Sequence, residues 1–281
     1  MTAAPPGAAP DAVDEAAAAV FAAAYAGVAP TPLVVVIAAF NEQGAVGGVV
    51  RRVPATVCGL AASTVVVVDG ASDATAAEAA EAGALVCDVA VNRGQGAALR
   101  LGYRLARDRG AELIATLDAD GQFDPAELAA VVGPLVAGQA DFVSGSRRLG
   151  RSLTTDRVRR LGVVVFARVI SVLGGQRVTD PANGLRAMRA ELTAAVPLRQ
   201  PQYQAAELLL GAARLGYRLA EVPTTMHRRH VGASKKGPNL LYGWRFARVI
   251  AATWWGVRPS SVGPAKTNHS KTANLARKST P

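Results

Sequence analysis

The sequence predicts an α/β fold in which a mostly parallel sheet is flanked by helices. Three observations lead to this prediction. Short apolar runs alternate with helical stretches through the first half of the chain. The runs are nearly continuous, as is typical of strands buried on both faces of a parallel sheet. Polar residues follow these runs, and the carboxyl ends of parallel strands share one edge of a sheet, where ligands bind.

The expected strands are short and rich in Val, Ile, Leu and Ala, and a stretch of helical pattern follows most of them. We expect strands at Leu33–Ala39, Thr64–Val68, Leu85–Val86, Glu112–Leu117 and Phe142–Ser144. We expect helices at Asp11–Ala26, Ala45–Val53, Ala74–Gly83, Gly96–Arg109 and Pro125–Val136, the last with proline in its first turn.

Composition fits one large domain with a sizeable core, because the chain has 281 residues and 50% of them are hydrophobic. Cys58 and Cys87 lie far apart without the spacing of a zinc site, so a structural zinc is not expected. No uninterrupted apolar run is long enough for a transmembrane helix. The N-terminus lacks the basic start of a signal peptide.

The net charge of +10 indicates a phosphate-bearing partner, such as a nucleotide, an anionic lipid or a nucleic acid. The charge is uneven, since residues 147–189 hold ten arginines and two acidic residues, and residues 227–236 form a second basic cluster. No zinc finger or RNA-recognition motif is present, so we do not expect nucleic acid as a partner.

The most informative segment is Asp118-Ala119-Asp120, which directly follows an apolar strand. Residues i and i+2 of a strand point to the same side, so both carboxylates could face one site. Two like charges so close favour a divalent cation that carries a phosphate. A plain Asp/Gly turn is the alternative for this segment taken alone.

Other predicted strand ends carry polar residues too, which favours a pocket for a phosphorylated ligand over an isolated turn. They are Asn41 and Glu42 after the first strand, Asp69 and Asp73 after the second, and Ser144 and Arg147 after the fifth.

Seven segments together resemble the motifs of family 2 glycosyltransferases with the GT-A fold, in the branch of dolichol-phosphate mannose synthase and related polyprenyl-phosphate glycosyltransferases. They are Ala38–Glu42, Val68–Thr75, Asn92–Leu99, Asp118–Gln122, Ser144–Arg147, Thr179–Arg186 and Arg229–Lys235. The chain departs from the family pattern at Ala38, Val68, Gln95 and Leu185, where the family has Pro, Asp, Lys and Phe. The departures at Ala38 and Val68 leave room for an inactive sugar-nucleotide binder.

The resemblance implies a GT-A domain over residues 31–255, with a nucleotide-binding half (about 31–146) and an acceptor half (about 147–255). Residues 1–30 would be an extension, partly disordered or helical. A C-terminal amphipathic helix would precede a basic disordered tail over 256–281.

The resemblance also implies roles for individual residues. Residues expected at the nucleotide sugar are Ala38, Phe40, Glu42, Asp69, Asp73, Gly96, Asp118, Ala119, Asp120, Gln122 and Arg147. Residues expected to bind the acceptor or a phosphate are Arg147, Asp180, Arg186, Arg229, Ser234 and Lys235. Asp118, Asp120 and Gln122 would hold Mg²⁺ or Mn²⁺, and the catalytic residues would be Asp120, Arg229, Lys235 and Glu207.

The implied reaction moves a hexose, mannose or glucose, from GDP-mannose or UDP-glucose to a polyprenyl (dolichyl-type) phosphate with inversion. Such an acceptor is already an anion and needs no strong base. The alternative is a soluble enzyme with a hydroxyl acceptor, which would need a base. Glu207 and Asp180 are the available carboxylates, although either could instead hold an arginine such as Arg186.

Two segments could reach a membrane surface, Leu161–Leu173 and Trp244–Trp255, because they combine apolar residues with arginine or tryptophan. Both could also be core helices with exposed arginines. We expect a cytoplasmic protein, peripheral on the cytoplasmic face of an anionic membrane, and we leave a homodimer open.

Overall fold

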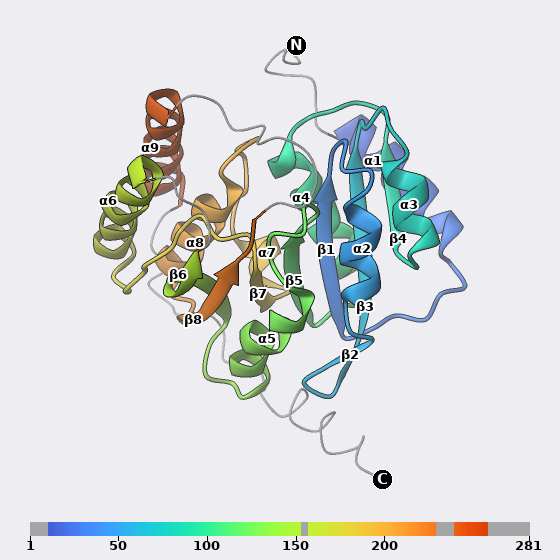
Figure 1. Cartoon of the computed structure of the whole chain (residues 1–281), viewed down its shortest axis with the longest axis horizontal. Helices are drawn as coiled ribbons and strands as arrows, with labels where there is room; N and C mark the ends of the chain where they lie inside the picture. Colours follow the sequence, from blue (N-terminus) through green and yellow to red (C-terminus); the bar gives the residue numbers. More distant parts are fainter. Residues whose placement is uncertain (1–10, 153–156, 229–238, 258–281) are drawn as a thin grey trace.

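The protein is an α/β molecule built on one mixed, mostly parallel sheet (Figure 1). A computed structural model describes residues 11–152, 157–228 and 239–257. The expected disordered segments at the two chain ends, 1–10 and 258–281, lie outside the described residues.

The first half alternates strands and helices as predicted, with one short strand, β2, that the sequence did not indicate and with β3 longer than expected. Its elements are α1 (Asp11–Ala24), β1 (Leu33–Ala39), α2 (Val46–Arg52), β2 (Thr56–Val57), β3 (Leu60–Asp69), α3 (Thr75–Glu81), β4 (Leu85–Val89), α4 (Gln95–Asp108) and β5 (Leu113–Asp118).

The second half begins with a 3₁₀ turn at Pro125–Glu127 and adds two strands that the sequence did not indicate, β7 and β8. Its further elements are α5 (Leu128–Val136), β6 (Phe142–Ser152), α6 (Arg157–Gly174), β7 (Arg186–Arg189), α7 (Leu192–Ala195), α8 (Gln204–Arg214), β8 (Leu219–Met226) and α9 (Asn239–Gly256).

The strands lie side by side in the order β4-β3-β1-β5-β7-β6-β8, and the short β2 forms a hairpin with the start of β3. The pairs β1·β3, β1·β5, β3·β4 and β6·β8 are parallel, whereas β7 runs antiparallel to both β5 and β6. Because β7 is antiparallel to both of its neighbours, β6 runs in the same direction as β1, β3 and β5. β7 begins at the edge where β1, β3 and β5 end.

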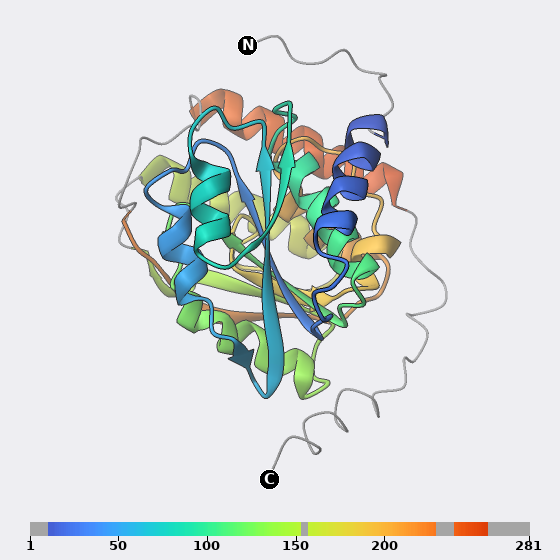
Figure 2. The same cartoon turned by 90° about the vertical axis from the view of Figure 1, so that its right-hand side faces the viewer.

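Alternate residues of the central strands enter two separate cores. Val34 and Val36 of β1 face α4 and α8, while Leu33, Val35 and Ile37 face α2 and α5. Helices therefore cover both faces of the sheet, which explains why the strands are apolar throughout. α1 lies beside β4 and α4 on the outer part of the first face (Figure 2).

The largest difference from the prediction is the length of β6, expected at Phe142–Ser144 and observed at Phe142–Ser152. Its polar second part continues the pairing with β8 after a bulge between Ser146 and Arg151. This extension depends on a partner strand far along the chain, which no local apolar run can indicate.

α6 and α9 pack against each other through a ring contact between Phe166 and Phe246, with centroids 4.5 Å apart. They form one flank of the molecule (Figure 1). None of the helices in the described ranges is both long and apolar enough to cross a membrane.

Candidate active site

The candidate site lies at the sheet edge where β1, β3 and β5 end and β7 begins, beside residues 144–147 of β6. The loops after β1 and β3 are locked together there. Asn41, in a left-handed conformation with φ 51°, accepts a hydrogen bond from the N–H of Ser72 at 2.9 Å. The N–H of Glu42 donates to the hydroxyl of Thr75 at 2.9 Å. The half-buried Phe40 and Glu42, both expected at the nucleotide, are therefore held on a fixed loop.

Asp73 supports this arrangement from the loop after β3. Its carboxylate accepts the N–H of Thr75 at 3.0 Å and the N–H of Gln43 at 3.2 Å. Burial acts to raise the pKa of Asp73, but the donors from Thr75 and Gln43 outweigh it and the pKa is lowered. Asp73 therefore stays ionised and ties the two loops together.

Asp69 ends β3 and is 2% exposed. Its Oδ2 accepts the backbone N–H groups of Arg93 and Gly94 at 2.9 and 2.7 Å, and its Oδ1 lies 3.6 Å from Nε of Arg93. Burial raises the pKa of Asp69, and the bonds to Arg93 and Gly94 offset this only in part. In this structure the carboxylate, expected at the nucleotide, anchors the loop between β4 and α4.

Asp118 is the last residue of β5, and Asp120 lies in the turn that follows it. Asp118 is half-buried, pairs in register with Ala38 of β1, and accepts a hydrogen bond from Nε2 of Gln95 at 3.4 Å. Asp120 is 6% exposed and accepts the backbone N–H of Gln122 at 3.0 Å. Ala119, between them, is buried in the core.

Gly184 shapes the space around Asp118, a role that no sequence pattern indicated. A Cβ on Gly184 would stand 2.2 Å from Oδ2 of Asp118, so any side chain there would force the carboxylate or the backbone to move. The carbonyl of Gly184 accepts the hydroxyl of Thr116 at 2.8 Å, which fixes its distance from β5. The segment before β7 therefore presses its backbone against the acidic motif.

Gln122 connects the acidic loop to the end of β8. Its carbonyl accepts the N–H of His227 at 2.8 Å, and its Nε2 donates to the carbonyl of His227 at 3.2 Å. The sequence indicated His227 only as the start of a basic cluster. The structure shows that this cluster begins directly at the acidic loop.

The residues at the end of β5 fit a Mg²⁺ or Mn²⁺ ion. Two carboxylates and an amide offer oxygen donors, which suit hard divalent cations, and Mg²⁺ commonly binds one or two carboxylates together with substrate phosphates. Within the residues that the structure describes, no group of three or more His, Cys, Asp or Glu side chains forms a closed metal cage. The donor set therefore suits a cation that shares its coordination with a diphosphate.

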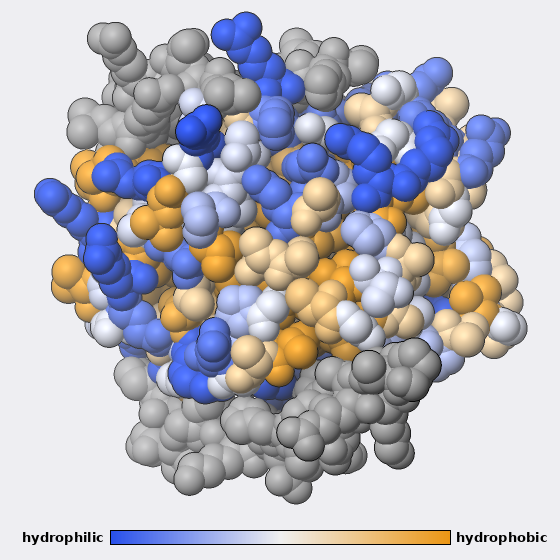
Figure 3. Space-filling view, turned by 60° about the horizontal axis from the view of Figure 1, so that its bottom comes forward, coloured by the Kyte–Doolittle hydropathy of each residue, from blue (hydrophilic) through white to orange (hydrophobic). Residues whose placement is uncertain are grey.

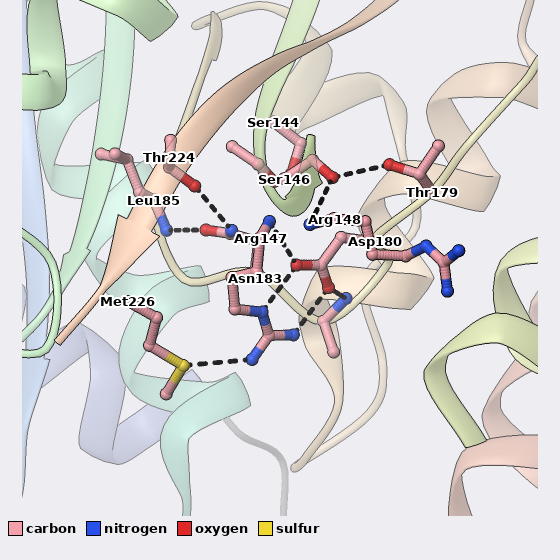
Figure 4. Close-up of polar contacts among 12 residues, drawn as sticks. Ser144, Ser146, Arg147, Arg148, Thr179, Asp180, Asn183, Leu185, Thr224 and Met226 are labelled. Atoms are coloured by element: carbon pink, nitrogen blue, oxygen red, sulfur yellow. Dashed lines mark hydrogen bonds and ion pairs between the residues drawn. The ribbon is translucent and has the colours of Figure 1, made fainter. Parts of the chain in front are cut away.

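An ion pair joins Arg147, in the middle of β6, to Asp180 in the segment before β7 (Figure 4). Nε and Nη2 of Arg147 each donate to an oxygen of Asp180 at 2.6 Å, and the backbone N–H of Arg147 adds a third bond at 3.1 Å. Asp180 is 0% exposed. Both were expected at the acceptor. Asp180 holds an arginine, as the alternative allowed, but that arginine is Arg147 and not Arg186.

Arg186 is the first residue of β7 and is 3% exposed. Its register partners are Thr116 of β5 and Ser144 of β6. Its Nε and Nη1 atoms are buried without a hydrogen-bond partner in the described part of the chain. The structure therefore places this residue, expected at the acceptor phosphate, inside the protein beneath the site.

Glu207 lies on α8 and is 3% exposed. It accepts the backbone N–H of Arg199 at 2.7 Å and that of Gln200 at 3.1 Å. Burial raises the pKa of Glu207, and these N–H donors offset the rise only in part. In this structure Glu207 serves as an internal anchor for the segment before α8, not as an exposed base.

Gly96 meets that same segment. Its N–H donates to the carbonyl of Pro201 at 2.8 Å, and a Cβ on Gly96 would stand 2.1 Å from the carbonyl oxygen of Gln200. Gly96, expected at the nucleotide sugar, thus packs the start of α4 against the chain ahead of α8. Arg229, Ser234 and Lys235 lie outside the described residues.

Comparison with known proteins decides the family. The model of the family described as Glycosyl transferase family 2 matches residues 34–195. The chain belongs to this family. It is a glycosyltransferase with a GT-A fold, and the predicted family, fold class and enzyme class are confirmed.

Named relatives act on lipid phosphates. A dolichyl-phosphate hexose transferase of Haloferax volcanii is 35% identical over 206 residues, covering 73% of this chain and 87% of the relative. An undecaprenyl-phosphate mannosyltransferase of Micrococcus luteus is 30% identical over 175 residues, covering 59% of this chain and 71% of the relative.

Among solved structures, glucosyl-3-phosphoglycerate synthase from Mycobacterium tuberculosis, in complex with Mn²⁺, UDP and phosphoglyceric acid, superposes with a TM-score of 0.62. The match covers 92% of this chain and 86% of the synthase, and the two sequences are 23% identical. This likeness shows the fold.

Proposed function

We propose that this glycosyltransferase transfers a hexose from a nucleotide diphosphate sugar to a polyprenyl phosphate, with inversion at the anomeric carbon. One observation carries the choice of acceptor. Asp180 and Glu207, the candidate bases for a hydroxyl acceptor, are both buried and bonded to protein partners. A phosphate acceptor is already an anion and needs no such base, whereas a hydroxyl needs one.

The donor would bind at the sheet edge, with Asp118, Asp120 and Gln122 holding Mg²⁺ or Mn²⁺. When bound, such an ion neutralises the diphosphate and makes it a better leaving group. The chain's own residues position the donor: Phe40 and Glu42 lie on the loop locked to the loop after β3, and Gly184 limits where Asp118 can stand. The rate would come mainly from positioning and charge neutralisation.

The acceptor phosphate would meet positive charge from Arg147 and from the segment that contains Arg229, Ser234 and Lys235. Asp180 fixes the orientation of the Arg147 guanidinium (Figure 4). Nη1 of Arg147 lies 3.3 Å from the sulfur of Met226 at the end of β8. Arg229 follows His227 by two residues, and His227 is bonded to Gln122. This supports a phosphate-binding role for the Arg229–Lys235 segment.

The flank formed by α6 and α9 supports peripheral binding to the cytoplasmic face of an anionic membrane. Val165 and Val172 of α6 are 51% and 82% exposed, and Trp244 and Trp255 of α9 are 63% and 78% exposed. Arg168, Arg245 and Arg248 are exposed on the same two helices. On the face of the molecule drawn in Figure 3, hydrophobic and hydrophilic residues are interspersed. Tryptophan and arginine beside apolar side chains are typical of interfacial helices.

We take GDP-mannose as the first donor to test and UDP-glucose as the second. Val68, which stands where family members have an aspartate, is 1% exposed and lies in the core. It therefore offers no polar contact to a base. Discrimination between bases would fall to neighbouring polar groups such as Glu42.

The test is a transfer assay with the full chain. Labelled GDP-mannose and UDP-glucose are each supplied with a polyprenyl phosphate, with Mg²⁺, Mn²⁺ or a chelator. We expect a lipid-linked sugar from one donor and its loss with the chelator. No lipid-linked sugar from any donor would overturn the proposal, and transfer to a hydroxyl acceptor under the same conditions would establish the alternative.

Membrane binding is tested by sedimentation of the protein with anionic and with neutral vesicles. Replacing Trp244 and Trp255 with Ala should weaken binding to anionic vesicles. Val20→Ala, an equally exposed apolar residue on α1 (71% exposed), is the matched control and should bind normally. Equal binding by all variants would contradict a membrane role for α9.

A further inference from the structure

α1 lies outside the 34–195 range of the family match, yet it is joined to the candidate donor site by charge. It packs on β4 and α4 (Figure 2). Two adjacent acidic residues face these elements: Asp14 forms an ion pair with Arg93, and Glu15 forms an ion pair with Arg104. Arg104 belongs to the middle of α4, whereas Arg93 belongs to the loop that leads into the site.

Arg93 sits between two carboxylates from different parts of the chain. Its Nη1 contacts Asp14, and its Nε lies 3.6 Å from Oδ1 of Asp69. The side chains are 15%, 16% and 3% exposed for Arg93, Asp14 and Asp69. With so little solvent, the guanidinium of Arg93 is stabilised by both carboxylates, while Asp69 is also held by the backbone N–H groups of Arg93 and Gly94.

The same loop reaches the acidic motif. The backbone N–H groups of Arg93 and Gly94 are bonded to Asp69, and the next residue, Gln95, donates its side-chain amide to Asp118. A Cβ on Gly70 would stand 2.2 Å from the backbone nitrogen of Asn92, so the loop is pressed against the end of β3. A shift of Arg93 would therefore be felt at both Asp69 and Asp118.

We propose that α1 is a working part of the donor site and that Asp14 is a positioning residue for nucleotide-sugar binding. Asp14 fixes Arg93, Arg93 fixes the loop between β4 and α4, and this loop sets the place of Asp69 and Gln95. This inference rests on the proposed donor site.

The test compares two neighbouring charge removals on one helix. Asp14→Asn should raise the KM for the donor on the order of tenfold, with little change in kcat or in the KM for the acceptor. Glu15→Gln breaks the ion pair with Arg104. This ion pair joins α1 to α4 but does not involve the loop between β4 and α4. Glu15→Gln should leave the donor KM unchanged. Asp14→Glu, which keeps the charge, should recover part of the loss.

A double-variant cycle tests whether the effect passes through Arg93. Arg93→Met should raise the donor KM, and Asp14→Asn added to it should raise it no further. Independent, additive effects would overturn the proposed route. Equal donor KM values for Asp14→Asn and Glu15→Gln, or a uniform loss of activity that follows Tm, would show that α1 is only structural.

Calorimetric titration with GDP and UDP, in the presence of Mg²⁺, separates this inference from the proposed reaction. If the unaltered chain binds a nucleotide but transfers no sugar to polyprenyl phosphate, the acceptor assignment fails while the Asp14 comparison still stands. If Asp14→Asn then binds that nucleotide as tightly as the unaltered chain, the inference fails.

Discussion

The two halves of the molecule use their carboxylates in different ways. In the first half, Asp118 ends β5 and Asp120 lies in the turn after it, at the sheet edge that also carries the loops after β1 and β3. In the second half, Asp180 and Glu207 are 0% and 3% exposed, one holding Arg147 and the other holding the backbone before α8. An acidic residue in a family motif can thus be committed to partners within the protein, and its neighbours decide this.

We expect the largest loss of turnover from substitutions at Asp118 and Asp120. Asp118→Asn and Asp120→Asn should each lower turnover on the order of a thousandfold, because each removes a charge that the proposed donor site needs for its cation and diphosphate. Initial rates at saturating Mg²⁺ or Mn²⁺ measure this. Asp124→Asn is the control: Asp124 follows in the same loop but caps the 3₁₀ turn through the N–H of Ala126, so turnover should persist. Unchanged metal-dependent rates in both site variants would refute the assignment.

Gly184 offers a way to disturb Asp118 without changing any charge. Gly184→Ala places a methyl group 2.2 Å from Oδ2 of Asp118, so the carboxylate or the segment before β7 must move. We expect about a hundredfold loss of turnover, since a shift of about 1 Å in a reacting group has this effect. Gly48→Ala on α2, where a Cβ meets nothing within 4 Å, is the control. Full activity of Gly184→Ala would show that the position of Asp118 is not critical.

Glu207 tests whether the buried carboxylates of the second half stabilise the fold and do not act in the reaction. Glu207→Gln should lower stability by about 1–3 kcal/mol, through its bonds to Arg199 and Gln200, and should lower kcat less than tenfold. Urea unfolding and kcat measured from pH 5 to 9 separate the two effects. A base would behave differently: kcat would collapse and the acidic limb of the pH profile would vanish.

The smallest effect concerns the opposite edge of the sheet, where Asp141 precedes β6 and pairs with Arg189 and Arg218. Burial acts to raise the pKa of Asp141, but its bonds to Arg218 and Arg189 outweigh this and the pKa is lowered. The ionised carboxylate therefore stabilises the fold above its unfolded pKa of about 3.9, and this contribution is lost as pH falls through the lower folded value.

Asp141→Asn should therefore lower the free energy of unfolding by about 2 kcal/mol at pH 7, and the difference should shrink below pH of about 3.9. Urea unfolding at both pH values measures it. Asp88→Asn, an exposed residue of β4, is the control and should change little. If the difference in free energy of unfolding between the unaltered chain and Asp141→Asn grew on acidification, the lowered pKa of Asp141 would be contradicted.

Local pattern was enough to predict the first half of the fold, because its strands pair with neighbours and bury both faces. β1 was predicted with its observed ends, and α4 within one residue at each end. Prediction was weakest after Ser144, where β6 continues through polar residues and β7 runs antiparallel. Those strands form because distant partners supply the hydrogen bonds, and the period-2 pattern of a four-residue strand is too short to detect.

The sequence by itself determined the family, the strand that carries Asp118 and Asp120, and the polar residues that end β1 and β3, because these depend on residue types at short spacing. Only the tertiary structure decided which charged residues are committed to partners within the protein. It paired Arg147 with Asp180, buried Arg186, committed Glu207 to backbone and brought Asp14 of α1 to Arg93. The physical reason is that a buried charge must find a partner, and that partner can lie anywhere along the chain.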